Sequence, residues 1–214
     1  MKTRHTVLVT CISGALLGTA GPALPQPNWY AGLALGASDA NMNADVVAVT
    51  GATATNFVTD QREPTFKVFA GYAFNRYFAV EGGFAWLGEF QATNQVLAPT
   101  TGALNAEIRV IGLFIDAVGM LPIGERFAAL AKLGVVGSET RTFRSTSGTV
   151  TPAPGTNTNA TTDQANLKYG LGVQYALSKT VTLRAEWERI QDVGDPNTGE
   201  FDLNLFYGAL LFRF

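Results

Sequence analysis

Apolar and polar residues alternate along most of the chain with a period of two. Successive side chains of a β-strand point to opposite faces, so this alternation predicts strands that are apolar on one face. The alternating segments are about ten residues long and are bounded by turn-forming residues. Eight such strands are predicted, at Trp29 to Ser38, Thr65 to Phe74, Tyr77 to Leu87, Glu107 to Leu121, Phe127 to Gly137, Leu167 to Leu177, Val181 to Ile190 and Leu203 to Phe214.

The connections between these segments alternate between short and long. Short turns are expected at Asn75 and Arg76, at Pro122 to Arg126 and at Ser178 to Thr180. Short turns at one end and longer loops at the other are typical of outer-membrane β-barrels. The longer, solvated loops are expected at Asp39 to Pro64, Gly88 to Ala106, Ser138 to Asn166 and Gln191 to Asp202.

The charged residues inside the predicted strands fall mainly on one face. They share that face with glycine and alanine, whereas most bulky apolar residues lie on the other face. The separation is imperfect, because Phe69, Phe114 and Leu130 fall on the charged face. The charged positions are Lys67, Glu81, Asp116, Lys132, Lys168, Arg184 and Glu186.

This distribution of charge decides which face can meet lipid. A Lys or Arg side chain that faces lipid at the bilayer midplane costs about 2 to 4 kcal/mol, so the charged face must turn inward if the strands span a membrane. Glu107, Arg109 and Arg189 lie on the apolar face, and we expect them at strand ends, where charged groups reach head groups and water. Past the first segment, the longest apolar run is Val110 to Ile123, which Asp116 interrupts, so we predict that any crossing is made by strands.

A soluble barrel of the lipocalin type would have the same alternation with its apolar face turned inward. Three features favour the membrane barrel: the small face is rich in glycine and alanine, aromatic residues gather near strand ends, and the last strand alternates up to the final residue. That strand carries Leu210, Phe212 and Phe214 on one face. The fold prediction is therefore all-β, an eight-stranded antiparallel up-and-down transmembrane β-barrel.

The first residues have the three regions of a secretory signal peptide. Lys2 and Arg4 precede the apolar run Thr6 to Ala20, and small residues follow it, so cleavage after Ala20 or after Ala23 fits the pattern. We assign residues 1–23 to the signal peptide and residues 24–214 to one barrel domain of the bacterial outer membrane. No further domain is expected after the barrel.

Charge and residue usage exclude several function classes. Removal of the signal peptide takes the basic residues from 15 to 13 and leaves 17 acidic residues, a net charge of −4. No basic patch is interleaved with aromatic residues, so nucleic-acid binding is not predicted. His5 and Cys11 are the only histidine and cysteine, and both lie in the signal peptide. We therefore predict no enzyme activity, no cofactor and no metal site.

Several segments resemble the transmembrane domain of the OmpA family of outer-membrane proteins. Gly71 to Gly88 resembles its second hairpin without a gap. Trp29 to Gly32 is similar to its first strand, and Phe212 to Phe214 is similar to the closing signal that the barrel-assembly machinery reads. A further match runs from Gly172 to Ala176, through Arg184 to Trp187, and on to Val193 to Asp195.

The resemblance also implies roles for interior residues. In the family a glutamate and an arginine pair inside the barrel and block the pore, and the matching positions here are Glu81 and Arg184. A competing lysine and glutamate can open the pore in the family, whereas the matching positions here are Val118 and Gln174. The resemblance thus favours a fixed ion pair over a switching gate.

The width of the predicted barrel sets what its interior can do. Eight strands leave an interior that side chains just fill, and buried charges need partners. Glu186 and Glu188 could suggest the paired acids of a glycosidase, but their position beside Arg184 on one strand is better explained by an interior network. The candidate network, with a regulated ion path as the alternative, comprises Glu81, Asp116, Lys132, Arg184 and Glu186.

Three functions remain open from the sequence. The leading hypothesis is a structural or surface-exposed barrel with a polar, largely plugged lumen. The alternatives are a small-conductance porin-like channel and an adhesin or surface receptor that binds host or environmental ligands through loops 39–64 and 138–166. The expected partners are outer-membrane lipid, lipopolysaccharide and the barrel-assembly machinery, which would read Leu210, Phe212 and Phe214 as the assembly signal.

Overall fold

A computed structural model of the chain describes residues 28–41, 49, 51–60, 62–98, 101–149, 151, 159–194 and 200–214. The predicted signal peptide, residues 1–23, lies outside the described residues. Within the described ranges no helix is long and apolar enough to cross a membrane. The strands are β1 (Asn28–Asn41), β2 (Ala54–Asp60), β3 (Arg62–Ala73), β4 (Phe78–Ala98), β5 (Gly102–Ile123), β6 (Phe127–Gly148), β7 (Asn159–Ala176), β8 (Val181–Val193) and β9 (Phe201–Arg213).

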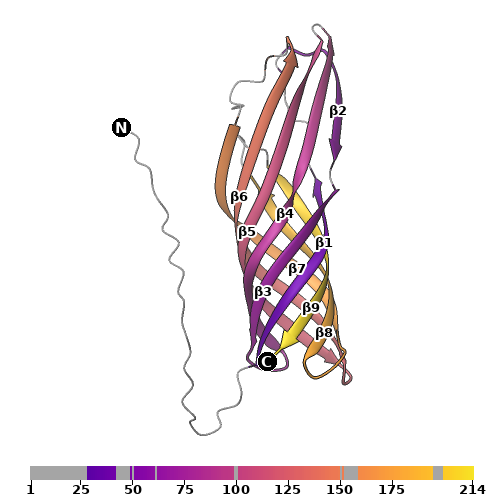
Figure 1. The fold of residues 1–214 in the computed structure, drawn as a ribbon, viewed down its shortest axis with the longest axis vertical. Helices are drawn as coiled ribbons and strands as arrows, with labels where there is room; N and C mark the ends of the chain where they lie inside the picture. The colour runs from indigo at the N-terminus through magenta and orange to yellow at the C-terminus, as the bar shows by residue number, and fades with distance from the viewer. Residues whose placement is uncertain are drawn as a thin grey trace, which may run out of the picture.

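The strands close into a ring of antiparallel pairs (Figure 1). β1 pairs with both β3 and β9, and β4 pairs with β5, which closes the sheet. β2 and β3 pair with successive parts of β4, so together they occupy one position in the ring. Eight positions result, and the predicted fold class is confirmed.

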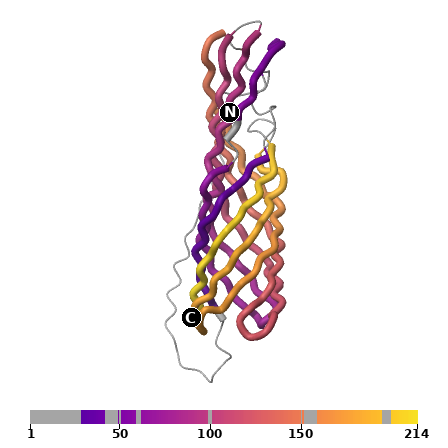
Figure 2. Tube along the Cα trace, turned by 90° about the vertical axis from the view of Figure 1, so that its right-hand side faces the viewer, coloured from indigo at the N-terminus to yellow at the C-terminus, as the bar shows by residue number. Residues whose placement is uncertain are grey.

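The strands are longer than the alternation predicted. The predicted long loops are therefore wrong, because much of their length belongs to strands. Loop 39–64 contains β2 and the start of β3, and loop 138–166 is largely the end of β6 and the start of β7. The predicted loop Gly88 to Ala106 is mostly an extended β4–β5 hairpin. β2, β4, β5 and β6 therefore rise beyond β1, β8 and β9 on one side of the barrel (Figures 1 and 2). We call this projecting sheet the wing.

A β-bulge explains why the alternation in β4 could not be followed past Leu87. The register with β5 shifts between Trp86 and Gly88, and Gly88 has a positive φ of 131°, which favours glycine. Below the bulge the odd-numbered residues of β4 face inward, and above it Phe90 and the following even-numbered residues do so. A fixed period of two therefore predicts the wrong face beyond the bulge.

The outer wall carries a continuous apolar band. Along β5 the outward positions from Ile111 to Ile123 hold no charged residue, and Leu113 and Leu121 are 65% and 64% exposed. The thirteen residues from Ile111 to Ile123 span about 40 Å along the strand. A tilt of about 40° reduces the span to about 30 Å, close to the thickness of the hydrocarbon core of a bilayer.

Charged pairs on the outer wall mark the upper border of this band. Nη2 of Arg109 on β5 lies 2.7 Å from Oε2 of Glu89 on β4 and 3.5 Å from Oε1 of Glu107. On β6, Arg141 pairs with Glu139. Glu107 and Arg109 were expected at a strand end, but β5 continues beyond them into the wing. They face outward where the apolar band ends.

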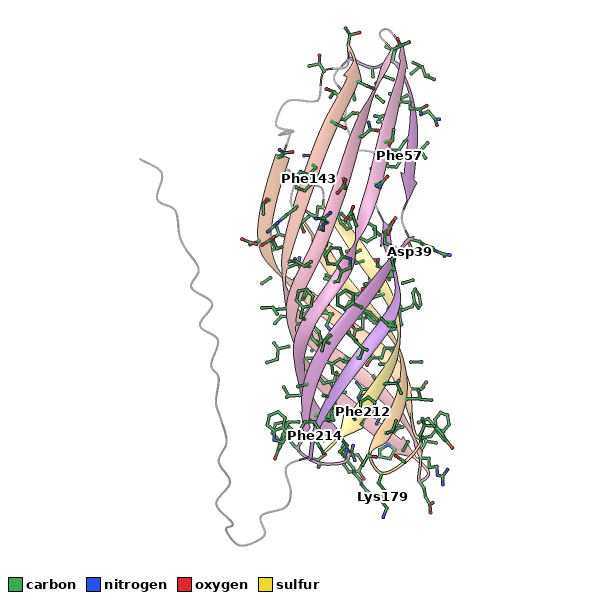
Figure 3. All side chains as sticks on the ribbon, in the orientation of Figure 1. Asp39, Phe57, Phe143, Lys179, Phe212 and Phe214 are labelled. Atoms are coloured by element: carbon green, nitrogen blue, oxygen red, sulfur yellow. The ribbon has the colours of Figure 1, made fainter. Side chains whose placement is uncertain are left out.

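At the other end, exposed aromatic side chains surround the short turns. Trp29 stacks edge-on against Tyr72 with ring centres 5.2 Å apart, and Phe127 packs on Tyr175 at the same separation. Phe212 lies at this end of the barrel, on the outer wall (Figure 3). Amphipathic aromatic rings are enriched where barrels meet the membrane–water interface, so these residues define the lower border of the band.

The position of the apolar band predicts how much an added outward-facing charge destabilises the barrel at each depth in the membrane. Leu133 lies on the outer face of β6 within the band and is 59% exposed, whereas Ser145 lies on the same face of the same strand in the wing. We expect Leu133→Arg to lower the free energy of unfolding by about 2 to 4 kcal/mol, and Ser145→Arg by less than about 1 kcal/mol. Urea unfolding in phospholipid vesicles, followed by tryptophan fluorescence, measures both. Equal losses would contradict the placement of the bilayer.

Candidate functional site

Eight charged side chains from six strands meet inside the barrel, at the level of the apolar band. Each is at most 5% exposed, and four are cations and four are carboxylates, so their formal charges cancel. Because strand neighbours alternate between wall and interior, each charged residue lies between two residues that face lipid. We call this set the ion cluster: Lys67 (β3), Glu81 (β4), Asp116 (β5), Lys132 (β6), Lys168 (β7), and Arg184, Glu186 and Glu188 (β8).

Glu81 is bound by two cations and a hydroxyl group. Arg184 Nη1 lies 2.6 Å from Glu81 Oε1, and Lys132 Nζ lies 2.7 Å from Oε2. The Tyr30 hydroxyl donates a hydrogen bond of 2.7 Å to Oε1. The remaining donors of Arg184 reach Gln174 Oε1 at 3.2 and 3.3 Å. Both carboxylate oxygens of Glu81 are thus satisfied within the barrel.

The two other glutamates link the cations into one network. Lys67 pairs with Glu186 and lies 2.7 Å from Glu188 Oε1. Lys132 Nζ is 2.6 Å from Glu186 Oε1, so Glu186 joins two lysines. Lys168 Nζ contacts Glu188 Oε2 at 3.3 Å. A buried charge without a partner is costly, and here every charge contacts at least one group of opposite sign.

Asp116 is connected to this network through Lys168. Its Oδ2 atom lies 2.8 Å from Lys168 Nζ, and the Asp116 side chain is fully buried. Asp116 comes from β5 and Lys168 from β7, with β6 between them, so the pair spans a strand inside the barrel. Such a contact requires correct register in three consecutive strands.

The bulky residues on the charged face fill the space around the ion cluster. Lys168 Nζ lies 3.9 Å from the centre of the Phe114 ring, and Lys132 Nζ lies 5.6 Å from that of Phe69. A cation over an aromatic face is attracted by the ring quadrupole, so these rings add favourable contacts beside the carboxylates. Phe69 and Phe114, which looked like defects in the alternation, therefore complete the interior.

Small residues on the charged face make this packing possible. A Cβ atom at Gly32 would collide with the Phe69 ring, and one at Gly134 would collide with the Asp116 carboxylate and the β5 backbone. The narrow interior of an eight-stranded barrel has little spare volume. The glycines on this face are thus required by the size of their neighbours across the strands.

All five network residues predicted from the sequence lie in the ion cluster. Sequence reasoning did not assign Lys67 and Lys168 to it, although both share the phase of the other interior charges. Their position on the charged face was the signal available in the sequence. Their ion-pair partners depend on which strands face each other in the closed barrel. Val118, where the family has a lysine, is buried directly opposite Lys132 in the β5–β6 register. The lysine that contacts Glu81 is therefore Lys132 of β6, the strand next to the one that carries Val118.

Above the ion cluster, bulky apolar side chains pack inside the barrel beside buried polar ones such as Ser138, Thr140 and Thr142. Phe90 and Phe201 stack edge-on with ring centres 5.9 Å apart. This apolar layer lies on the wing side and its members are at most 4% exposed. It comprises Leu87, Phe90, Ile108, Val110, Ile190, Val193, Phe201, Leu203 and Leu205.

The ion cluster and the apolar layer pack directly against each other. A cavity of about 10 Å³ lies between them, lined below by Lys67, Lys168 and Glu188 and above by side chains such as Leu87 and Ile190. That volume is at the lower limit for one water molecule. In the described ranges, no group of three or more His, Cys, Asp or Glu side chains is arranged to hold a metal ion.

An eight-position barrel with an apolar outer band, a neutralised charged interior and an aromatic lower border is a transmembrane β-barrel. Residues 25–207 match the family model described as the OmpA-like transmembrane domain. The chain belongs to this family and is a protein of the bacterial outer membrane. The resemblance inferred from the sequence is thereby confirmed, and this family is not a family of enzymes.

Curated relatives and solved structures agree with this assignment. The chain is 25% identical to outer membrane protein A of Salmonella typhi over 198 residues, which cover 91% of this chain and 50% of the relative. It is also 25% identical to that of Shigella flexneri over 197 residues, covering 91% and 51%. The chain thus spans about half the length of the curated relatives it matches.

Two solved barrels share the fold. The outer membrane protein OprG of Pseudomonas aeruginosa is similar with a TM-score of 0.51 at 15% identity, covering 87% of this chain and 96% of that chain. Neisserial surface protein A is similar with a TM-score of 0.50 at 13% identity, covering 87% and 97%. At these identities the likeness shows the fold alone.

The charge balance of the ion cluster predicts a coupled response to mutation. Glu81→Gln leaves a net charge of +1 inside the barrel, and Lys132→Met leaves −1. We expect each single variant to lose about 3 to 5 kcal/mol of unfolding free energy. The double variant restores neutrality, so its loss should be smaller than the sum by about 1 to 3 kcal/mol. Urea unfolding in vesicles measures the cycle, and strictly additive losses would refute the pairing.

Proposed function

We propose that the protein is a structural, surface-exposed barrel of the outer membrane whose lumen is closed. The proposal rests on two packed layers, the ion cluster and the apolar layer, which follow one another along the interior. The ion cluster joins strands across the barrel from β3 to β8, and the apolar layer covers it on the wing side. We further propose that the protein has no catalytic activity, because the described residues include neither histidine nor cysteine.

The two barriers oppose ion flow for different physical reasons. The side chains of the ion cluster are bound to one another in pairs and triplets, so an entering ion would have to displace a bonded partner. The bulky side chains of the apolar layer cannot replace the hydration shell of an ion, and narrow apolar constrictions exclude water. Breaking the Glu81–Arg184 pair alone would leave the second barrier intact.

Planar-bilayer recordings test the closed lumen. We expect no conductance steps from the wild-type protein, and none from Glu81→Ala or from Phe90→Ala, because each substitution weakens only one barrier. Heat-modifiable migration on a gel serves as the control that each variant has inserted as a folded barrel. Discrete openings in the wild type whose size or frequency changes in Glu81→Ala would instead establish a channel controlled by this pair.

The membrane partners follow from the outer wall and the last strand. We propose that Leu210, Phe212 and Phe214 form the signal read by the barrel-assembly machinery. The three side chains share the outward face of the chain end and are 42%, 52% and 78% exposed. The apolar band is proposed to contact outer-membrane lipid, with lipopolysaccharide on the wing side, where long connections face the outside of the cell.

The wing supports a second candidate function, binding of a ligand or host surface outside the cell. Loops 39–64 and 138–166 were expected to carry this role as solvated loops, but much of each is strand. β4, β5 and β6 instead present paired strands beyond the barrel, with Phe143 exposed on the outer face of the wing (Figure 3). A rigid sheet positions side chains with less loss of conformational entropy on binding than a flexible loop does.

Shortening the wing separates this function from that of the barrel. Residues 93–96 pair with residues 102–105 at the end of the β4–β5 hairpin, and Ala92 pairs with Ala106 directly below them. Replacing 93–105 by a two-residue Asn-Gly turn should leave the membrane-spanning part folded, as judged by heat-modifiable migration. We expect the shortened protein to lose most of any adhesion that cells gain by displaying the wild type. Undiminished adhesion would exclude the hairpin tip as the binding surface.

A further inference from the structure

Four basic side chains at the short-turn end of the barrel are set apart from the others by their contacts. Within the described part of the chain, Arg76, Arg126, Lys179 and Arg213 form no ion pair with a carboxylate. Arg76 has only an aromatic contact, 4.7 Å from the centre of the Tyr77 ring. The basic residues that do pair with carboxylates are Arg62, Lys67, Arg109, Lys132, Arg141, Lys168, Arg184 and Arg189.

These four residues line a single cavity. Its volume is about 670 Å³, and it opens at the lower end of the barrel, where Lys179 lies (Figure 3). Arg76 comes from the β3–β4 turn, Arg126 from the β5–β6 turn, Lys179 from the β7–β8 turn and Arg213 from the end of β9. Each of three turns and the last strand thus contributes one cation. We call this cavity the basic vestibule.

The inner wall of the basic vestibule is uncharged, and the cavity as a whole carries net positive charge. Met120, Gln174 and Thr182 line its inner part, and Gln174 is hydrogen-bonded to Arg184 of the ion cluster. Glu125 is the one acidic side chain that lines the cavity, so four cations and one carboxylate give a formal charge of +3. A concave surface with one sign of charge concentrates its field and attracts ions of the opposite sign.

We propose that the basic vestibule binds a soluble anion that carries carboxylate or phosphate groups. The planar guanidinium groups of Arg76, Arg126 and Arg213 can each bind such a group through two parallel hydrogen bonds. A cavity of this size falls in the range that holds small-molecule ligands. Short turns of outer-membrane barrels face the periplasm, so the anion enters from that compartment.

The arrangement of side chains favours a soluble anion over a lipid head group. The four cations line the cavity at the mouth of the barrel, whereas exposed aromatic residues of the lower border, such as Phe74, Phe78 and Phe212, are not among its lining residues. A phospholipid at that border would place its head group outside the ring of strands. The vestibule instead opens along the barrel axis to water.

Titration of the folded barrel with citrate and with inorganic phosphate tests the proposal. The protein is held in nanodiscs of phosphatidylcholine, which adds no net lipid charge, and binding is measured by calorimetry at low ionic strength. We expect binding by the wild type that weakens as salt is added. The variant R76Q/R126Q/K179Q/R213Q should bind about tenfold more weakly or worse, because four charge contacts are lost.

A matched control removes the same number of charges elsewhere. R62Q/R109Q/R141Q/R189Q alters four basic residues outside the vestibule and should bind citrate and phosphate like the wild type. Heat-modifiable migration verifies that each variant is folded. Lys179→Gln changes one exposed turn residue whose turn is held by Ser178, so it provides a mild variant that should also weaken binding.

Three results would overturn the proposal. The first is absence of citrate and phosphate binding by the wild type. The second is equal weakening in the control variant, which would mean that overall charge and not the vestibule attracts the anion. The third is retention of phosphatidylglycerol, seen by native mass spectrometry, that depends on the four cations while the soluble anions do not bind. That result would assign the site to a lipid head group.

Discussion

The neutralisation of charge inside the barrel is the constraint on which the rest of the structure depends. Charged groups removed from water need partners of opposite sign, and here four cations and four carboxylates from six strands supply them. The pairs join residues far apart in sequence, such as Glu81 with Arg184 and Asp116 with Lys168. A shift of one residue in any of these strands would turn its charge toward lipid, so the ion cluster and the apolar band together specify one register.

The interior changes character along the barrel because its lining changes at the bulge in β4. Below Gly88 the inward positions of the sheet carry the ion cluster, and above it they carry the apolar layer. Side chains such as Phe90 and Ile108 can be buried there because the extended strands continue the wall beyond the ion cluster. Two layers of unlike chemistry therefore follow one another along the interior, and the small cavity between them shows how closely they pack.

The two ends of the barrel present different surfaces to their surroundings. On the wing side several charges of the outer wall are paired within the sheet, as Arg109 is with Glu89. At the opposite end Arg76, Arg126, Lys179 and Arg213 face one cavity without paired carboxylates among the described residues. Strand pairing can place opposite charges side by side on the wall, whereas the turns bring like charges together around the mouth.

Most of the fold could be predicted from the sequence, because alternation with a period of two is a local property of each strand. The phase of Glu81, Lys132 and Arg184 also placed them on one face before their partners were known. Two things depended on tertiary structure. The bulge at Gly88 reverses the phase of β4, and only strand pairing shows that much of the predicted loops 39–64 and 138–166 continues the sheet. The contacts inside the barrel depend on which strands lie across the lumen, and only closure of the ring brings Lys67 to Glu186 and Glu188.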